Sequence, residues 1–586
     1  MDSAQEYFDL GAHRRPVGTA SETAQLWFDR GLNWTYGFNH EEAAACFRAA
    51  IEADPGCVMA YWGLAYTLGP NYNKPWEAFD PDELGDVVHL THEAVDTALG
   101  LIEAPGVVDI DPIEASLVRA LRHRYPQDVP AEDCAIWNPP YAEAMAEVYA
   151  QCPDDLDVAT LYADALMNLT PWELWDLRTG EPAPGSRALD ARQVLDRALS
   201  LPGGTEHPGV LHLYIHLMEM SSVPEEALVV ADRLRGLVPD AGHLQHMPTH
   251  LDVLCGDYRR VVEGNTEAIR ADDRFVARRG AMNFYTLYRA HDHHFRIYGA
   301  MFLGQSQVAL EAADALERAI PDDLLRVESP PMADWLEGFL AMRVHVLIRF
   351  GRWHDILALE LPEDATLYAT TTAMIRYARG VAAAALGLIE DADRERASFL
   401  TAKSAVPETR MLFNNTCRDI LEVADAMQAG EIAYRKGDID DAFGELRRAI
   451  DLDDDLPYDE PWGWMQPTRH AYGALLLEQG RIGEAARVYE ADLGISDELP
   501  RALQHPGNVW ALHGYHESLC ALGRHDESRI IERQLTLARA LADVEIEASC
   551  FCRLEVGEDR TAHQHHHGHD AHHHGHHHNG HEPHLG

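Results

Sequence analysis

Residues 27–55 read WFDRGLNWTYGFNHEEAAACFRAAIEADP, and this stretch decides the fold that the sequence predicts. Gly31 and Ala43 are small residues at the positions where two antiparallel helices would touch. Phe47 would fill the core between those helices, and Pro55 would end the second one because proline cannot continue an α-helix. The stretch therefore predicts a hairpin of two helices.

The same spacing of small and apolar residues recurs further along the chain. Two later sets repeat it: Gly430, Ala442, Leu446 and Ala449, then Gly473, Ala485 and Tyr489. The segments between them are rich in Ala, Leu, Arg and Glu, and none alternates polar and apolar residues with the period of two that strands show. We therefore expect an all-α body built from repeated helical hairpins.

These residues resemble the tetratricopeptide repeat (TPR). The matching positions are Trp27, Gly31, Trp34, Ala43, Phe47, Ala50 and Pro55, with Trp34 where the pattern usually has Tyr. The resemblance implies a TPR-like helical-hairpin solenoid, a superhelix whose first helices line a concave groove. Six further runs resemble a broad group of microbial TPR-repeat proteins: residues 36–40, 60–63, 68–73, 168–172, 246–250 and 458–462.

Loop-like insertions rich in Pro, Gly or acidic residues interrupt the predicted repeats, for example at 70–81, 176–209 and 451–467. We expect an N-terminal TPR-like region at 1–180, a central region with a His-lined groove at 205–405, and a C-terminal region at 425–556. The segment 557–586 is a low-complexity, His-rich tail that we expect to be disordered.

Charge and the absence of known motifs exclude several function classes. The 586 residues include 96 acidic and 48 basic side chains, a formal net charge of −48. That field repels phosphates and anionic lipids, so we expect no nucleic-acid and no membrane partner. The sequence shows neither a secretory signal nor an apolar run of about 18 residues, and we expect a cytoplasmic protein. Nucleotide-binding glycine loops and the Gly-x-Ser-x-Gly elbow are also missing.

Histidine is the unusual residue type in this chain. There are 34 histidines, of which thirteen lie in the tail and nine lie between His207 and His294. In this second group His212 and His246 are 246 − 212 = 34 residues apart, and His216 and His250 are separated by the same interval. Because 34 residues is the TPR period, equivalent positions should stack about 10 Å apart on neighbouring helices.

We therefore expect these imidazoles to converge in the groove, with His291 and His294 closing the metal site from the next repeat. The set is large enough for two ions, or for one ion with an open position. Neutral imidazole is a weak clamp for a peptide and a good metal ligand. The predicted ligands are His212, His216, Glu219, His243, His246, His250, His291 and His294. Glu219 and Tyr298 are the candidate catalytic residues.

Imidazole ligands suit Cu, Fe and Zn, and the sequence leaves the choice among them open. The favoured function is a metal-dependent enzyme, an oxidoreductase acting on a small molecule, while a hydrolytic Zn centre is a second possibility. Two other classes fit the sequence: a TPR scaffold that binds an acidic peptide in its groove, and a metal chaperone or buffer that uses the His-rich tail.

Overall fold

The computed structural model describes residues 7–104 and 110–554. The described residues up to Arg553 form one compact unit, and the three expected repeat regions with their boundaries stay a prediction. The expected disorder of the tail at 557–586 lies outside the described residues. In the described part of the chain, no helix combines the length and apolarity that a bilayer crossing requires.

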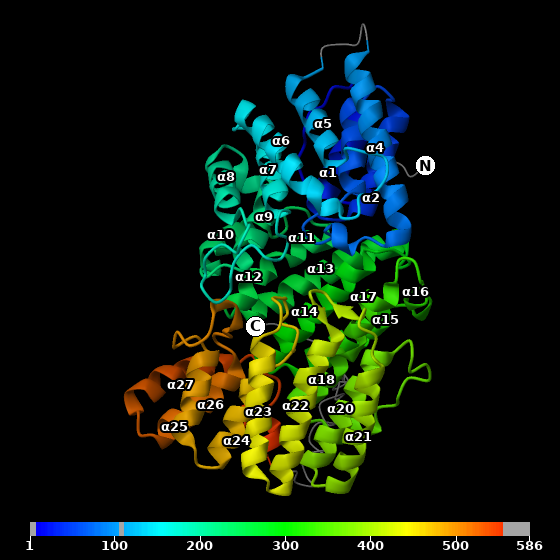
Figure 1. Ribbon diagram of the computed structural model, residues 1–586. Coiled ribbons are helices and arrows are strands. Elements are labelled where there is room, and N and C mark those ends of the chain that lie inside the picture. The colour runs from blue at the N-terminus through cyan, green and yellow to red at the C-terminus, as the bar shows by residue number, and fades with distance from the viewer. Residues whose placement is uncertain (1–6, 105–109, 555–586) are drawn as a thin grey trace, which may run out of the picture. The chain divides into compact units, whose positions relative to one another are not determined.

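The helices follow one another along the chain, some joined by short turns and others by long loops, as between Met167 and Ala188 (Figure 1). The first third contains α1 (Glu22–Tyr36), α2 (His40–Ala53), α3 (Val58–Leu68), α4 (Pro81–Glu103), α5 (Pro112–Arg124), α6 (Asn138–Gln151), α7 (Leu156–Met167) and α8 (Ala188–Ser200). The middle contains α9 (Pro208–Glu219), α10 (Leu228–Leu234), α11 (Gly242–His246), α12 (Pro248–Leu254), α13 (Tyr258–Arg279), α14 (Thr286–Leu303), α15 (Ser306–Ala319), α16 (Asp322–Leu325), α17 (Met332–Leu336), α18 (Met342–Arg349), α19 (Trp353–Ala358), α20 (Ala369–Ala385) and α21 (Ile389–Ala405).

The last third contains α22 (Cys417–Lys436), α23 (Ile439–Asp454), α24 (Thr468–Glu478), α25 (Ile482–Asp492), α26 (Val509–Ala521) and α27 (His525–Arg539). Short 3₁₀ helices are η1 (Trp76–Ala78), η2 (Cys134–Trp137), η3 (Gly204–Glu206), η4 (Pro224–Ala227), η5 (Glu337–Ala341), η6 (Arg501–Leu503) and η7 (Phe551–Arg553). Two short antiparallel strands, β1 (Met411–Leu412) and β2 (Asn415–Thr416), pair Met411 with Thr416 and Leu412 with Asn415.

Neighbouring helices pack in pairs. α1 packs on α2, α13 on α14, α20 on α21, α22 on α23, and α26 on α27 (Figure 1). Many helices also contact the first helix of the next pair, as α2 contacts α3 and α25 contacts α26. The predicted all-α, TPR-like helical-hairpin fold is therefore confirmed.

Glycine allows the helices of the first repeat to approach closely. Gly31 on α1 and Gly63 on α3 both face the fully buried ring of Phe47 on α2. A Cβ atom would lie 2.8 Å from that ring at Gly31 and 2.3 Å from it at Gly63, which is closer than atoms can pack. One aromatic side chain is thus held between two glycines, and the three helices share one contact.

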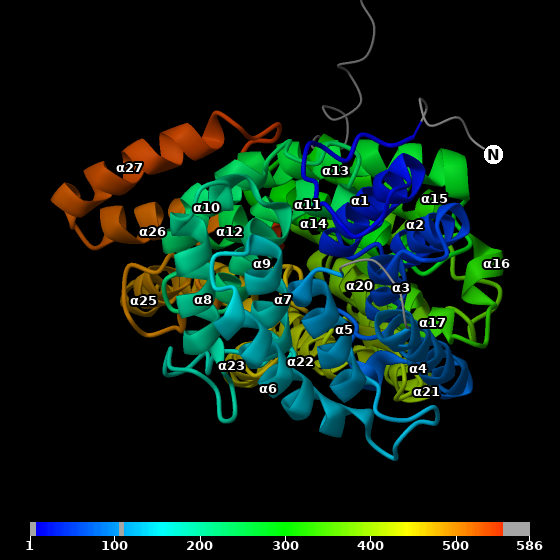
Figure 2. The same ribbon diagram turned by 90° about the horizontal axis from the view of Figure 1, so that it is seen from above.

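The helices that carry the candidate site meet near the middle of the chain. α9 contacts α1, α7 and α12, while α11 contacts α13 and α14 (Figure 2). Gly209, near the start of α9, makes the contacts with α1 and α7 possible. A Cβ atom at this position would lie 2.7 Å from the ring of Tyr36 and 2.7 Å from the methyl group of Thr160. The close approach brings the following turns of α9 against the end of α1.

We predict that Gly63→Ala destabilises the protein, because the new methyl group would displace the Phe47 ring and overpacking costs about 1–3 kcal/mol. Gly85→Ala on α4 is the matched control, since no atom lies within 4 Å of a Cβ built there. Exchanging a helical Gly for Ala in open space stabilises by roughly 0.5–1 kcal/mol. Chemical denaturation of both variants measures the difference, and equal effects would contradict the close contact.

Candidate metal centre

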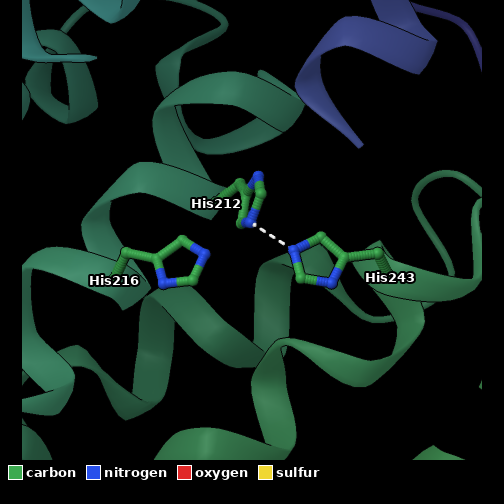
Figure 3. A group of neighbouring side chains, drawn as sticks. All are labelled: His212, His216 and His243. Atoms are coloured by element: carbon green, nitrogen blue, oxygen red, sulfur yellow. Dashed lines mark hydrogen bonds between the residues drawn. The ribbon is translucent and has the colours of Figure 1, made fainter. Parts of the chain in front are cut away.

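Three imidazoles meet between α9 and α11. His212 and His216 lie on α9, and His243 lies on α11. One ring nitrogen of each lies within 4.8 Å of the other two, and Nε2 of His212 is 3.1 Å from Nε2 of His243 (Figure 3). All three side chains are buried. We call this cluster site A.

Two rings of site A are held by acceptors on their outer nitrogen. The Nδ1–H of His212 donates to the carbonyl oxygen of Tyr36 at 2.6 Å, and the Nδ1–H of His216 donates to Oε1 of Glu219 at 2.9 Å. Because a carbonyl and an ionised carboxylate can only accept, Nε2 of each ring carries a lone pair. Nε2 of His216 is buried without a hydrogen-bond partner among the described residues. This is the arrangement in which outer partners orient imidazoles toward a metal ion.

A second cluster, site B, consists of His246 on α11, His250 on α12 and His291 on α14. Nε2 of His246 is 2.7 Å from Nε2 of His250. The Nδ1–H of His246 donates to Oδ1 of Asn265 at 2.7 Å. The amide orientation follows from the Asn265 Nδ2 group, which donates to the carbonyl oxygen of Val261 at 2.8 Å. The Nε2 atom of His246 therefore also carries a lone pair.

Glu219 contacts one histidine of each site. While Oε1 accepts from His216, Oε2 lies 2.7 Å from Nδ1 of His250, and Oε2 of Glu460 lies 2.9 Å from the same nitrogen. Atoms of Glu219, His250 and Glu460 are also close enough together to hold an ion. The sequence predicts Glu219 as a ligand, and that stays a prediction. Its Oε1 atom accepts from the His216 ring and so orients this imidazole.

Burial sets the charge of most of these histidines. Burial and the neighbouring imidazoles lower the pKa of five rings well below the usual value: His212, His216, His243, His246 and His291. They are neutral at pH 7, which is the form that binds metal.

His250 is different. Burial also lowers its pKa, but the carboxylates of Glu219 and Glu460 outweigh burial and raise the pKa to about 10. Without metal, His250 is therefore an imidazolium at neutral pH, and its Nε2–H donates to the lone pair of His246. A metal ion that enters site B must displace this proton.

Sites A and B are the same arrangement in successive repeats. His212 and His216 correspond to His246 and His250, each 34 residues later, as the sequence spacing indicates. His243 corresponds to His291, and here the interval is 291 − 243 = 48 because α13 is 22 residues long. The sequence leaves open whether this set holds one ion or two, and the structure brings six of the histidines together as two groups of three.

A third copy of the arrangement is incomplete. His294 and Tyr298 follow His246 and His250 by 48 residues, so a phenol replaces the second imidazole. Nε2 of His294 lies 2.8 Å from Sδ of Met465, away from site B. The ring of Tyr298 packs on Phe302, with centroids 4.5 Å apart. His294 therefore does not close site B as expected, and the described residues place neither side chain in a metal-sized cluster.

Three aromatic residues with a strained backbone conformation pack against histidines of the two sites. Phe38, Trp172 and Phe413 have φ values of 54°, 60° and 48°, and they are the residues other than glycine with positive φ in the described ranges. Their ring centroids lie 4.5 Å from His212, 6.0 Å from His216 and 4.5 Å from His291, respectively. Such backbone conformations cost about 1–3 kcal/mol each and cluster at functional sites.

Insertions cover the histidines that we expected on an open groove. None of the six imidazoles is more than 7% exposed. The ring of Tyr72, in the loop after α3, lies 5.0 Å from that of His216, and Glu460 reaches His250 from the segment between α23 and α24. These two segments belong to the loops at 70–81 and 451–467 that interrupt the repeats in the sequence. No local pattern in the sequence links Glu460 with the histidines, because 210 residues separate it from His250.

Another compact group of titratable residues anchors α9 to the N-terminal segment. The carboxylate of Asp157 accepts hydrogen bonds from Nε2 of His13, Nε2 of His207 and Nη1 of Arg15 at 2.9–3.1 Å. Nδ1 of His207 accepts from the backbone N–H of Val210 and so caps α9. Because these groups satisfy one another, the cluster is structural, and it fixes the helix that carries His212.

Comparisons with known proteins give no family. No family model matches this chain, and no curated protein sequence matches it. The solved structures that are similar to it include the following three. The APC/C hetero-tetramer Cut9–Hcn1 shares 13% identity and a TM-score of 0.30, covering 86% of this chain and 78% of that chain. Ypp1 shares 9% identity and a TM-score of 0.41, and the match covers 91% of this chain and 89% of that chain. Naa15/Naa10 bound to HypK-THB shares 12% identity and a TM-score of 0.19, and the match covers 88% of this chain and 70% of that chain.

None of these likenesses bears on function. The chain is a TPR-like helical-repeat protein by its own helical hairpins, and the resemblance to a microbial TPR-repeat group stays a prediction.

We predict that Glu219→Gln weakens metal binding at both sites by roughly 10–100-fold, the usual cost of losing an outer partner of a ligating histidine. The amide keeps one acceptor oxygen, but its NH2 group would face an imidazole N–H. Glu114→Gln is the matched control, since Glu114 is also buried and accepts from the backbone N–H of Gly18. Competition with a chelator measures both affinities, and a loss confined to one site would contradict the shared role.

Proposed function

We propose that sites A and B hold a pair of transition-metal ions and that the chain is a metal-dependent enzyme, an oxidoreductase that acts on a small molecule. The observation that carries this proposal is the repeated three-imidazole cluster. Acceptors hold the outer nitrogen of His212, His216 and His246, so the Nε2 atom of each of these rings offers a lone pair to an ion. Buried imidazoles that lack partners are costly, and a bound ion would satisfy them.

The donor geometry fits an ion. Two nitrogens that each bind one metal at 2.0–2.1 Å in tetrahedral geometry are about 3.3 Å apart. The Nε2 atoms of His212 and His243 are 3.1 Å apart, so little movement is needed. The two sites adjoin, because the rings of His243 and His246 lie 5.9 Å apart and those of His216 and His250 lie 6.1 Å apart.

The donor set favours copper among the three metals that suit imidazole. Non-haem iron sites generally include a carboxylate ligand, and neither group of three imidazoles contains one. Three neutral imidazoles suit copper, or zinc with a fourth position open. Copper, when bound, supplies one-electron chemistry. The protein's part is to hold the ions away from bulk water, to orient the imidazoles and to pack aromatic rings around them.

The two other function classes predict different metal behaviour. A scaffold that binds an acidic peptide would present its donors on a surface, whereas these six imidazoles are buried. A metal chaperone or buffer would depend on the thirteen tail histidines, which lie outside the described residues.

We predict that the purified protein holds about two metal ions per chain after dialysis at neutral pH. His216→Ala should leave about one, and His291→Ala should also leave about one, because each removes a ligand from a different site. His293→Ala is the control, since this buried neighbour belongs to neither site. Elemental analysis measures the stoichiometry, and the electron paramagnetic resonance spectrum identifies copper.

Deletion of residues 561–586 separates the function classes. Two ions should remain after the deletion. Loss of all metal with the tail would support the buffer instead, and absence of tightly held metal from the full chain would support the scaffold.

We further predict that metal affinity at site B rises with pH between 7 and about 10, by up to tenfold per pH unit. The reason is that His250 has a raised pKa, about 10, so its proton is held below that pH and is lost above it. Metal binding at pH 8 should release about one proton per ion at site B and almost none at site A. Calorimetry in buffers of different ionisation enthalpy counts the protons, and His291→Ala should abolish the release.

A further inference from the structure

A cavity of about 250 Å³ adjoins site A. Its walls come from the start of α2, the loop after α3 and the start of α14. Phe38 and Tyr288 form one wall, and on the other side their rings contact His243, with centroids 5.5 Å and 4.9 Å away. One layer of aromatic rings therefore separates the cavity from site A.

A smaller cavity continues toward the metal ligands. It has a volume of about 20 Å³, which is room for about one water molecule. It shares Phe38, His40 and Asn71 with the larger cavity, and His212 stands in its wall. An imidazole of site A therefore lines a small space whose wall shares three residues with the larger cavity.

A lysine beside the larger cavity has no carboxylate partner. Nζ of Lys74 lies over the rings of Phe79 and Phe284, 4.4 Å and 4.6 Å from their centroids, and all three residues line the cavity. Within the described ranges, no carboxylate oxygen comes within 4.0 Å of this nitrogen. The other two lysines of the chain, Lys403 and Lys436, are both ion-paired. In a chain with a net charge of −48, an ammonium group without an ion pair is available for a ligand.

A buried amide adds a second donor. Oδ1 of Asn39 accepts from the backbone N–H of Glu42 and caps α2, which fixes the orientation of the side chain. Its Nδ2 group is buried at the cavity without a hydrogen-bond partner in the described residues. The acidic residue in the lining is Glu41. Burial raises the pKa of its carboxyl group, which disfavours the charged form that would compete with a ligand for Lys74.

We propose that this cavity is the substrate pocket of site A and takes a small molecule with one aromatic ring and one carboxylate. The carboxylate accepts hydrogen bonds from Lys74 and Asn39, and the ring packs among the aromatic walls. A volume just below the roughly 300–1,000 Å³ of drug-sized pockets fits a single ring and excludes a peptide. The substrate role rests on the proposed function, whereas recognition of an aromatic carboxylate does not.

Phenylacetate and its neutral analogue phenylacetamide are suitable probes. Calorimetry on the full chain should give a dissociation constant below about 1 mM for phenylacetate, and phenylacetamide should bind at least tenfold more weakly. Lys74→Met should weaken the acid at least tenfold and leave the amide unchanged. Lys74→Arg, which keeps the charge, should retain most of the affinity, and Lys436→Met is the matched control.

Equal affinity for acid and amide, or an unchanged affinity in Lys74→Met, would overturn the proposal. If Lys74→Met does not fold, Phe284→Leu tests the aromatic wall and should weaken both probes. Metal-stripped protein should still bind phenylacetate, so absence of metal from the native chain would refute the proposed function and leave the pocket standing. In copper-loaded protein, phenylacetate should shift the copper spectrum, and an unchanged spectrum would refute the substrate role of the pocket.

Discussion

Close contact between helices at glycine is the constraint on which the rest of this structure depends. Phe47 packs between Gly31 and Gly63, and Gly209 lets α9 approach Tyr36. If any of these positions carried a side chain, the helices would move apart by at least the width of a methyl group. The Nδ1–H of His212 could then no longer reach the Tyr36 carbonyl at 2.6 Å, and site A would lose the partner that orients its first ring.

The repeat explains why two metal-sized clusters exist. A TPR-like hairpin places equivalent residues of successive first helices side by side, so the pattern His-x3-His on α9 and again 34 residues later produces two similar groups. Each group takes its third imidazole from the next repeat. The third copy fails because Tyr298 stands in the second position and Met465 faces His294. Duplication of one arrangement therefore accounts for both sites without separate ligand loops.

Electrostatics gives the two sites different properties despite this symmetry. Glu219 contacts a histidine of each, but only His250 has a second carboxylate, Glu460, at 2.9 Å. The histidines of site A are neutral, while site B holds a proton that a metal ion must displace. The paired charges also limit the cost of burial, because a buried carboxylate without a partner would be far more expensive. The two sites therefore differ in charge although the same repeat pattern places their histidines.

The sequence by itself determined the repeat, the helical hairpins and the set of histidines, because these depend on local spacing: 16 residues from Gly31 to Phe47 and 34 from His212 to His246. Only the tertiary structure decided how the histidines divide into two groups, which of them stay outside, and that Glu219 contacts one histidine of each group. The division depends on the length of α13 and on ring orientation, and no local spacing encodes either. Glu460 and Phe413 reach the site from loops more than 100 residues further along the chain, and such contacts exist only after the helices have packed.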